Sequence, residues 1–342
     1  MSDRTLPSPQ SLRTDSMPAW RQHRYGEADD VVLERADVPA PRRGHVLLRL
    51  RATGLNNGDV RVMRGKPLLV RLAFGLRRPR QAVRGIDAAG TVVALGEGVE
   101  GIAVGDEVVA ELPSGGGLAR YAVCPASRLV PRPAGVDALP AAALPVAGGT
   151  AWQALERGGV ASGHRVLVIG ASGGVGTFAV QLAAARGAEV WALCGERNRA
   201  LVEQLGAART FDYRAVAPDA PELAAQPFDV VIDIAGTTRL RTLQGLVRDG
   251  GAVVLVSGEG GRVLGPIGRI AAASVLSLGS KRPLRPLAAV AKPDVLAQLL
   301  ALTVAGSVRP VIERTFAFTE ARGALAHVAA GHTVGKVVVL AD

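Results

Sequence analysis

The sequence predicts an α/β protein with two domains: a β-rich domain and a doubly wound parallel sheet covered by helices. Three observations lead to this fold class. Up to about residue 140, short apolar runs alternate with Gly and Pro turns, which is typical of antiparallel strands. From about residue 141, strands alternate with helical segments, as in a parallel sheet. The 342 residues are 48% hydrophobic with a mean hydropathy of +0.24, enough for two folded cores.

The first 20 residues are polar and rich in Pro and Ser, so we expect a mobile tail there. They lack the apolar central run of a signal peptide. The longest stretch free of charge, residues 138–155, contains two prolines and a Gly-Gly pair, which makes it a poor membrane span. We therefore expect a cytoplasmic protein that does not bind membranes.

The expected β-rich domain covers residues 21–140, and the expected parallel sheet covers residues 141–291. Strands of the first domain are predicted at HVLLRLRATG, AAGTVVALG, DEVVAEL, ARYAVCP and SRLVPRP. In the second domain, strands are predicted at 165–170, 188–194, 208–213, 228–236, 251–260 and 284–291, with helices at 174–186, 197–207 and before residue 251. Residues 292–342 have the pattern helix, strand, helix, strand, and their β content predicts a return to the first domain.

The strongest local signal is VLVIGASGGVGTFAVQLA, residues 166–183. A buried strand runs directly into a glycine-rich turn and then into an amphipathic helix. Glycines permit a tight turn and a close approach of the backbone to a pyrophosphate, and the positive end of the helix meets the phosphate charge. Strand, turn, helix and second strand arrive in the order that a dinucleotide-binding motif requires. The predicted cofactor contacts in this turn are Ala171, Ser172, Gly173, Gly174, Val175 and Gly176.

The segment CGERN ends the second expected strand of this domain and bears on the choice of dinucleotide. An NAD site places an acid here for the ribose 2′-OH, whereas an NADP site offers a cation and space. Gly195 is small, Arg197 is basic, and Tyr213 and Arg214 follow the third strand, which favours NADPH. Glu196 favours NADH unless it points to solvent, so NADH stays open as the alternative.

The charge pattern and the two cysteines argue against several other classes. The net charge is +10, but only four of the 40 basic residues are lysines; the arginines are spread along the chain, and only 4% of residues are aromatic. Few stacking platforms are therefore present, and we expect no specific nucleic-acid binding. Cys124 and Cys194 are too few for a disulfide framework or a cysteine-rich zinc site.

From about residue 28 to its end, the sequence resembles the medium-chain dehydrogenase/reductase superfamily, in particular its zinc-free quinone oxidoreductase (zeta-crystallin-like) branch. The matching landmarks are GLNNGD (54–59), GIDAAGTVVALGEGV (85–99), VGDEVVA (104–110), LPVAGGTAWQAL (144–155), GASGGVGTFAVQLA (170–183), LGAARTFDY (205–213), FDVVIDIAG (228–236) and VGKVVVL (334–340). The resemblance implies a GroES-like catalytic domain over 21–140 and 292–342 and a Rossmann domain over 141–291. It also implies an active-site cleft between them and a homodimer.

The resemblance further implies which site residues are kept and which are lost. In zinc alcohol dehydrogenases a cysteine ligand stands at the position of Asn56 and a histidine ligand at that of Ile86, so we expect no catalytic zinc. Asn56 matches the active-site asparagine of the zinc-free branch, whose amide can hydrogen-bond a carbonyl or the nicotinamide. Thr150, Ser257 and Gly258 match residues beside the nicotinamide.

The loop after Asn56 departs from the family pattern at Asn57 and Arg61. Quinone reductases often carry tyrosines near these points, and this loop has none. Protonation after hydride transfer then falls to water or to a less obvious group, and Arg61 can bind an anionic substrate or cofactor phosphates. A solvated basic loop is the alternative. The candidate catalytic residues are thus Asn56, Asn57 and Arg61, while Asp59 and Asp87 are expected to hold the backbone through hydrogen bonds and caps.

The predicted activity is reduction of a quinone or an α,β-unsaturated carbonyl compound by NADPH, on a small to medium apolar substrate. The alternative on the same fold is a biosynthetic tailoring enzyme that acts on an elaborate, polyketide-like molecule, by a redox or a non-redox step. A third hypothesis is a non-catalytic protein that senses NADPH or binds nucleic acid.

Overall fold

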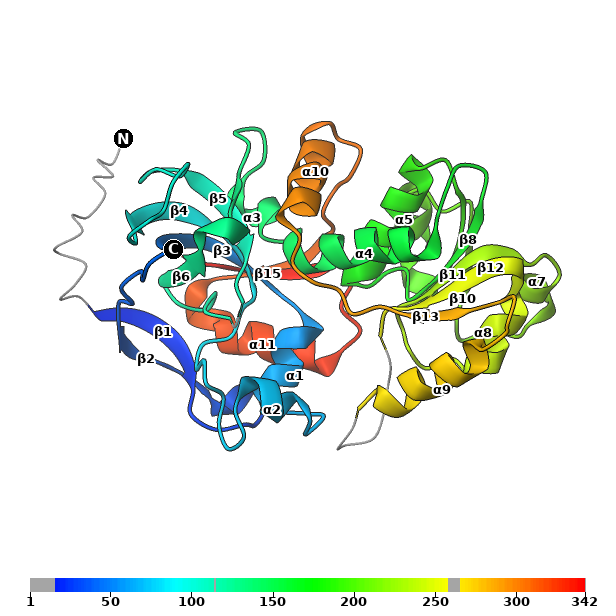
Figure 1. The fold of residues 1–342 in the computed structure, drawn as a ribbon, viewed down its shortest axis with the longest axis horizontal. Helices are drawn as coiled ribbons and strands as arrows, with labels where there is room; N and C mark the ends of the chain where they lie inside the picture. Colours follow the sequence, from blue (N-terminus) through cyan, green and yellow to red (C-terminus); the bar gives the residue numbers. More distant parts are fainter. Residues whose placement is uncertain (1–15, 114, 258–264, 342) are drawn as a thin grey trace.

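Two β-sheets, one toward each end of the molecule, organise the fold (Figure 1). The structure is a computed structural model that describes residues 16–113, 115–257 and 265–341. A long helix, α4 (Pro145–Gly158), lies between the two sheets in the middle of the molecule (Figure 1). One hydrophobic core runs through this junction, because Ala52 and Ala89 of the first sheet share a cluster with Val166 and Val230 of the second. The predicted fold class is confirmed.

The first sheet has seven strands and is antiparallel except for its parallel β14–β15 pair. Its backbone is the long β3, which pairs with β4, β6 and β15. Its strands are β3 (His45–Leu55), β4 (Asp87–Leu95), β5 (Glu107–Glu111), β6 (Tyr121–Pro125), β7 (Val130–Pro131), β14 (Ile312–Phe316) and β15 (Lys336–Leu340). The helices around it are α1 (Asn57–Arg64), α2 (Val70–Phe74), α3 (Ala138–Ala141), α10 (Pro293–Val304) and α11 (Ala321–Ala330). The last strand of the chain, β15, therefore pairs with β3, about 280 residues earlier in the sequence.

The second sheet is parallel throughout, in the order β10-β9-β8-β11-β12-β13. This is the 3-2-1-4-5-6 order of a doubly wound dinucleotide-binding fold, in which the strand order reverses between the first and fourth strands. The strands are β8 (Arg165–Ile169), β9 (Glu189–Cys194), β10 (Arg209–Asp212), β11 (Phe228–Asp233), β12 (Val247–Leu255) and β13 (Leu284–Pro286). The helices are α5 (Gly174–Ala185), α6 (Arg199–Gln204), α7 (Pro221–Ala224), α8 (Leu240–Leu246) and α9 (Ile267–Ser277).

The mobile tail predicted for residues 1–20 is wrong for its last part. Residues 1–15 lie outside the described residues, but Ser16–Gln22 form β1, which pairs with β2 (Val31–Asp37). Trp20 is buried, and its indole N–H donates to the carbonyl of Phe318 at 2.7 Å. The apolar side chains of this segment are thus held by a helix region some 300 residues away, a contact that local composition does not reveal.

No helix in the described ranges is both long enough and apolar enough to cross a bilayer.

Candidate active site

The glycine-rich turn lies where the order of the parallel sheet reverses. Gly170 directly follows β8 and has a φ of +87°, and a Cβ placed on it would lie 3.3 Å from the backbone nitrogen of Ala235, just beyond β11. Parallel sheets bind ligands in the crevice at this reversal, outside the carboxyl ends of the strands. The turn from Ala171 to Gly176 therefore occupies the position at which a dinucleotide pyrophosphate is held.

The turn is as tight as a dinucleotide-binding turn requires, because there is no room for a side chain at Gly176. A Cβ on Gly176 would lie 2.2 Å from the carbonyl oxygen of Gly170, so helix and turn approach more closely than any other residue permits. Gly173 is the N-cap of α5, whose first backbone N–H groups have no partner within the helix. Ser172, Gly173, Gly174 and Val175 are half-buried, so the turn remains accessible from outside. These residues would hold the pyrophosphate.

The end of β9 collects polar side chains around Gly195. A Cβ on Gly195 would lie 3.5 Å from Nη1 of Arg214, and the Arg214 guanidinium lies over the Tyr213 ring at 4.7 Å. Asn198 donates from Nδ2 to the Ser172 hydroxyl at 3.2 Å, which ties this strand end to the glycine-rich turn. The predicted cation Arg197 is exposed and has no partner among the described residues.

Glu196, the residue that kept NADH as the alternative cofactor, is exposed and forms an ion pair with Arg199. Both of its carboxylate oxygens accept hydrogen bonds from Nη1 of Arg199 at 3.2 Å. It therefore behaves as a surface residue at the start of a helix, where an acid is favoured.

Asn56 lies at the start of α1, and its side-chain amide is fixed at both ends. Nδ2 donates to Oδ2 of Asp87 at 3.0 Å, and Oδ1 accepts from the ammonium of Lys336, the first residue of β15. Lys336 also donates to the carbonyl of Leu55 at 3.0 Å and to Oδ2 of Asp87 at 3.1 Å. Asp87 accepts in addition the backbone N–H of Val146 at the start of α4, at 3.0 Å. The amide is thus one part of a buried ionic network.

Asp59 holds the backbone around Asn56, as predicted from the sequence. Its Oδ2 accepts the N–H of Asn56 at 3.0 Å, and its Oδ1 accepts the N–H of Gly85 at 2.8 Å. Burial, with the neighbouring negative charge of Asp87, raises the pKa of the Asp59 carboxyl to about 6. The two backbone hydrogen bonds oppose this rise, because they favour the charged form.

Arg61, beside the first sheet, and Ser257, beside the second, are in contact although they are 196 residues apart in the sequence. Nη2 of Arg61, on α1, donates to the hydroxyl of Ser257, which follows β12, at 3.2 Å. Both were predicted as site residues, one on the substrate side and one on the cofactor side. Asn57 is exposed at the first position of α1, and Gly258 lies outside the described residues.

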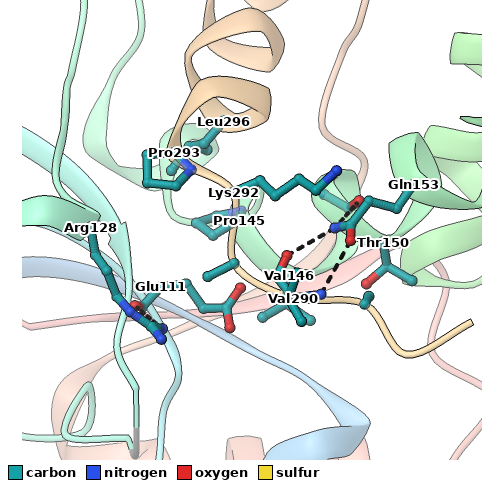
Figure 2. Close-up of a pocket in the computed structure, with 13 residues that line it drawn as sticks. Glu111, Arg128, Pro145, Val146, Thr150, Gln153, Val290, Lys292, Pro293 and Leu296 are labelled. Atoms are coloured by element: carbon teal, nitrogen blue, oxygen red, sulfur yellow. Dashed lines mark hydrogen bonds between the residues drawn. The ribbon is translucent and has the colours of Figure 1, made fainter.

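Thr150 lines a pocket of about 60 Å³ between α4 and residues 289–293 (Figure 2). Gln153 of α4 fixes that segment by bonding both the N–H and the carbonyl of Val290, at 3.2 and 2.9 Å. On the opposite side of the pocket lies Glu111, the last residue of β5, near Arg128 (Figure 2). The Glu111 carboxylate has no hydrogen-bond partner among the described residues.

The pKa of the Glu111 carboxyl is raised to about 7, first by burial and then by the charge of Asp87, which Arg128 partly offsets. Asp87 lies directly opposite Glu111 on the neighbouring strand. Because the folded state holds its proton more tightly than the unfolded chain, the contribution of Glu111 to stability falls as the pH rises from about 4.5 to 7.

A Glu111→Gln variant is therefore expected to exceed the wild type in free energy of unfolding by about 1–2 kcal/mol at pH 8 and by much less at pH 5. The amide resembles the neutral acid in shape, so it removes the cost of the buried charge and little else. Urea unfolding of both proteins at the two pH values measures the difference. A gap of the same size at pH 5 and pH 8 would show that the carboxyl does not titrate in this range.

Two residues, Lys336 and Glu111, were not identified as site residues from the sequence. Lys336 had one signal, since it is one of four lysines in an arginine-rich chain and opens the last strand. Glu111 had no distinguishing signal beyond its place at a strand end. Across the part of the chain that the structure describes, no group of three or more His, Cys, Asp or Glu side chains could hold a metal ion.

Comparisons with known proteins agree on the family. Residues 42–134 match the alcohol dehydrogenase GroES-like domain, and residues 205–339 match the zinc-binding dehydrogenase family. The chain is 36% identical over 313 residues to a chloroplast envelope quinone oxidoreductase homolog of Arabidopsis thaliana, covering 88% of this chain and 91% of that one. It is 31% identical over 365 residues to the mitochondrial NAD(P)H oxidoreductase RTN4IP1 of Bos taurus, covering 96% and 90%.

Two further proteins are similar to this chain over most of its length. A 2-methylene-furan-3-one reductase of Solanum lycopersicum is 30% identical over 337 residues, covering 94% of this chain and 79% of that one. The solved structure of the quinone oxidoreductase from Coxiella burnetii superimposes with a TM-score of 0.84 at 27% identity, covering 95% and 99%. The chain belongs to the medium-chain dehydrogenase/reductase superfamily, in its zinc-free quinone oxidoreductase branch, and it is an oxidoreductase that uses a nicotinamide cofactor.

Proposed function

We propose that this protein reduces quinones or α,β-unsaturated carbonyl compounds with NADPH. The observation that carries the proposal is the Asn56 amide, which has one N–H left over. By resemblance to the family, this residue stands at the position of a zinc ligand. Its Nδ2 donates one N–H to Asp87, and an amide nitrogen carries two. The second N–H is a neutral donor for a substrate carbonyl oxygen.

This chemistry needs no metal if hydride goes to a carbon that is already electrophilic. When bound, the nicotinamide supplies the hydride. The Asn56 N–H stabilises the enolate or quinol oxygen on which negative charge develops, and water supplies the proton. Thr150 is half-buried on α4, four residues (about one helical turn) after Val146, whose N–H is bonded to Asp87, and it would help to position the ring. A quinone reductase and a furanone reductase among the relatives support this substrate class.

The test is oxidation of NADPH, followed at 340 nm, against a panel of quinones and enones with NADH as the comparison cofactor. We expect turnover with at least one member of the panel, faster with NADPH than with NADH. Tight binding of NADPH without turnover of any member would remove the proposal.

The choice of NADPH rests on the surroundings of Gly195. The Arg214 guanidinium beside this glycine offers a planar cation for the 2′-phosphate, and Arg197 is a second, exposed cation. An Arg214→Ala variant should bind NADPH about 10- to 100-fold more weakly and NADH almost as well as the wild type, since one charge-assisted contact is lost. Fluorescence titration of both cofactors measures the effect.

Arg197→Ala, measured in the same way, shows which arginine contributes more. Arg322→Ala, which removes another exposed charge, on α11, is the control and should change neither affinity. Equal losses of NADPH and NADH affinity in Arg214→Ala would contradict the phosphate assignment.

A further inference from the structure

The charge of Lys336 lies inside the protein, since the residue is only 2% exposed. Its ammonium has three N–H groups and three acceptors: the Leu55 carbonyl, Oδ1 of Asn56 and Oδ2 of Asp87. Only one of these acceptors is charged. The lysine is therefore placed to organise its neighbours as well as to neutralise Asp87.

The consequence for Asn56 follows from donor and acceptor chemistry. An amide side chain can rotate by half a turn and exchange its oxygen for its NH2 group at almost no cost in shape. An ammonium can only donate, and a carboxylate can only accept. With Lys336 at one end and Asp87 at the other, only one of the two orientations makes both hydrogen bonds, the one with Oδ1 toward Lys336 and Nδ2 toward Asp87.

Lys336 also lies against the cofactor turn, through its own side-chain stem and the backbone of Gly335. Gly335 donates its N–H to the carbonyl of Ser172 at 2.9 Å, and Gly335 pairs with Gly173 in a parallel bridge. A Cβ on Gly174 would lie 3.4 Å from Cδ of Lys336. The segment 335–336 thus connects the glycine-rich turn to the Asn56 amide.

We propose that Lys336 is a positioning residue: it holds the Asn56 amide with its nitrogen, and not its oxygen, available to the substrate carbonyl, and it ties that amide to the cofactor turn. The inference rests on the proposed reduction, in which the spare N–H of Asn56 stabilises the developing oxyanion. Without Lys336 and the Asp87 carboxylate, neither neighbour selects an orientation, and Asn56 can present its oxygen instead, which repels the developing charge.

The competing explanation is that Lys336 only balances the buried charge of Asp87. Three variants separate the two: Lys336→Met, Lys336→Arg and the double variant Lys336→Met/Asp87→Asn. The double variant removes both charges together, so the fold no longer contains an uncompensated carboxylate. However, the amide that replaces the Asp87 carboxylate can donate or accept, so the double variant leaves Asn56 free to turn.

With a substrate on which the wild type is active, we expect the double variant to unfold close to the wild-type urea midpoint and to bind NADPH within about threefold of the wild type. Its kcat should nevertheless be about 10- to 100-fold lower, as after loss of one oxyanion donor. Lys336→Arg, which also only donates, should recover more kcat than Lys336→Met. Lys281→Met, which changes an exposed lysine in the loop before β13, is the control and should have wild-type kcat.

Full recovery of kcat in the double variant would overturn the inference and leave the proposed function intact. If the wild type reduces no member of the panel, the proposed function fails first, and the role of Lys336 is then decided on the protein without substrate. In that case, the shift in urea midpoint of the double variant Lys336→Met/Asn56→Ala should differ from the sum of the shifts of the two single variants. Additive shifts would exclude the Lys336–Asn56 coupling.

Discussion

A Gly176→Ala variant is expected to lose nicotinamide cofactor binding and about 2–4 kcal/mol of unfolding free energy. The new Cβ would lie 2.2 Å from the carbonyl oxygen of Gly170 and 2.7 Å from two backbone atoms of Ala171. No flexible side chain can move away, since all three neighbours are main chain. Helix α5 must therefore shift from the turn that holds the pyrophosphate.

The matched control is Gly245→Ala in α8, where a Cβ would meet no atom within 4 Å. Alanine in a helix is normally better than glycine by about 0.5–1 kcal/mol, so this variant should be slightly more stable than the wild type. Urea unfolding and NADPH titration of both variants make the measurement. Wild-type affinity in Gly176→Ala would mean that the turn does not hold the cofactor.

The cofactor half of the protein was predictable because its information is local. Strand β8, the glycine-rich turn and helix α5 follow one another within 21 residues, and the predicted helix 174–186 differs from α5 by a single residue at its end. The last predicted strand, 284–291, ends instead at Pro286, because Gln153 of α4 forms hydrogen bonds with the backbone of Val290 and holds the residues after the strand against α4. That contact joins residues 137 positions apart.

The substrate half was predictable only in part, because its contacts join residues that are far apart in the sequence. Asn56 was identified because it stands in a family motif, but the meaning of its amide depends on Asp87, 31 residues away, and on Lys336, 280 residues away. No period or spacing in the sequence connects these three. The buried ion pair between Lys336 and Asp87 becomes apparent only when β3, β4 and β15 lie side by side in the folded sheet.

Removal of the Asp59 carboxylate is the second change expected to have a large effect. In an Asp59→Ala variant the backbone N–H groups of Asn56 and Gly85 lose their acceptor, and both lie in a buried region around the start of α1. Each buried N–H left without a partner costs about 1–3 kcal/mol, so we expect the free energy of unfolding to fall by about 3 kcal/mol. Loss of the fixed Asn56 backbone should also lower kcat.

The pH dependence of this loss has a definite sign. The pKa of Asp59 is raised to about 6 in the folded protein, so the wild type itself loses stability as the pH rises from about 4 to 6, because the buried charge becomes unfavourable. Alanine has no such charge. The difference between wild type and Asp59→Ala should therefore be larger at pH 5 than at pH 8, by about 1 kcal/mol.

Asp106→Ala is the matched control for Asp59→Ala. Asp106 accepts the N–H of Ala103, three residues earlier, at 2.8 Å, the same local hydrogen bond that Asp59 makes with Asn56, but at an exposed position. Water can replace an exposed acceptor, so this variant should lose at most about 1 kcal/mol at either pH. If Asp59→Ala and Asp106→Ala lose the same amount, burial contributes nothing at Asp59, and the loop that presents Asn56 is held by its local turn alone.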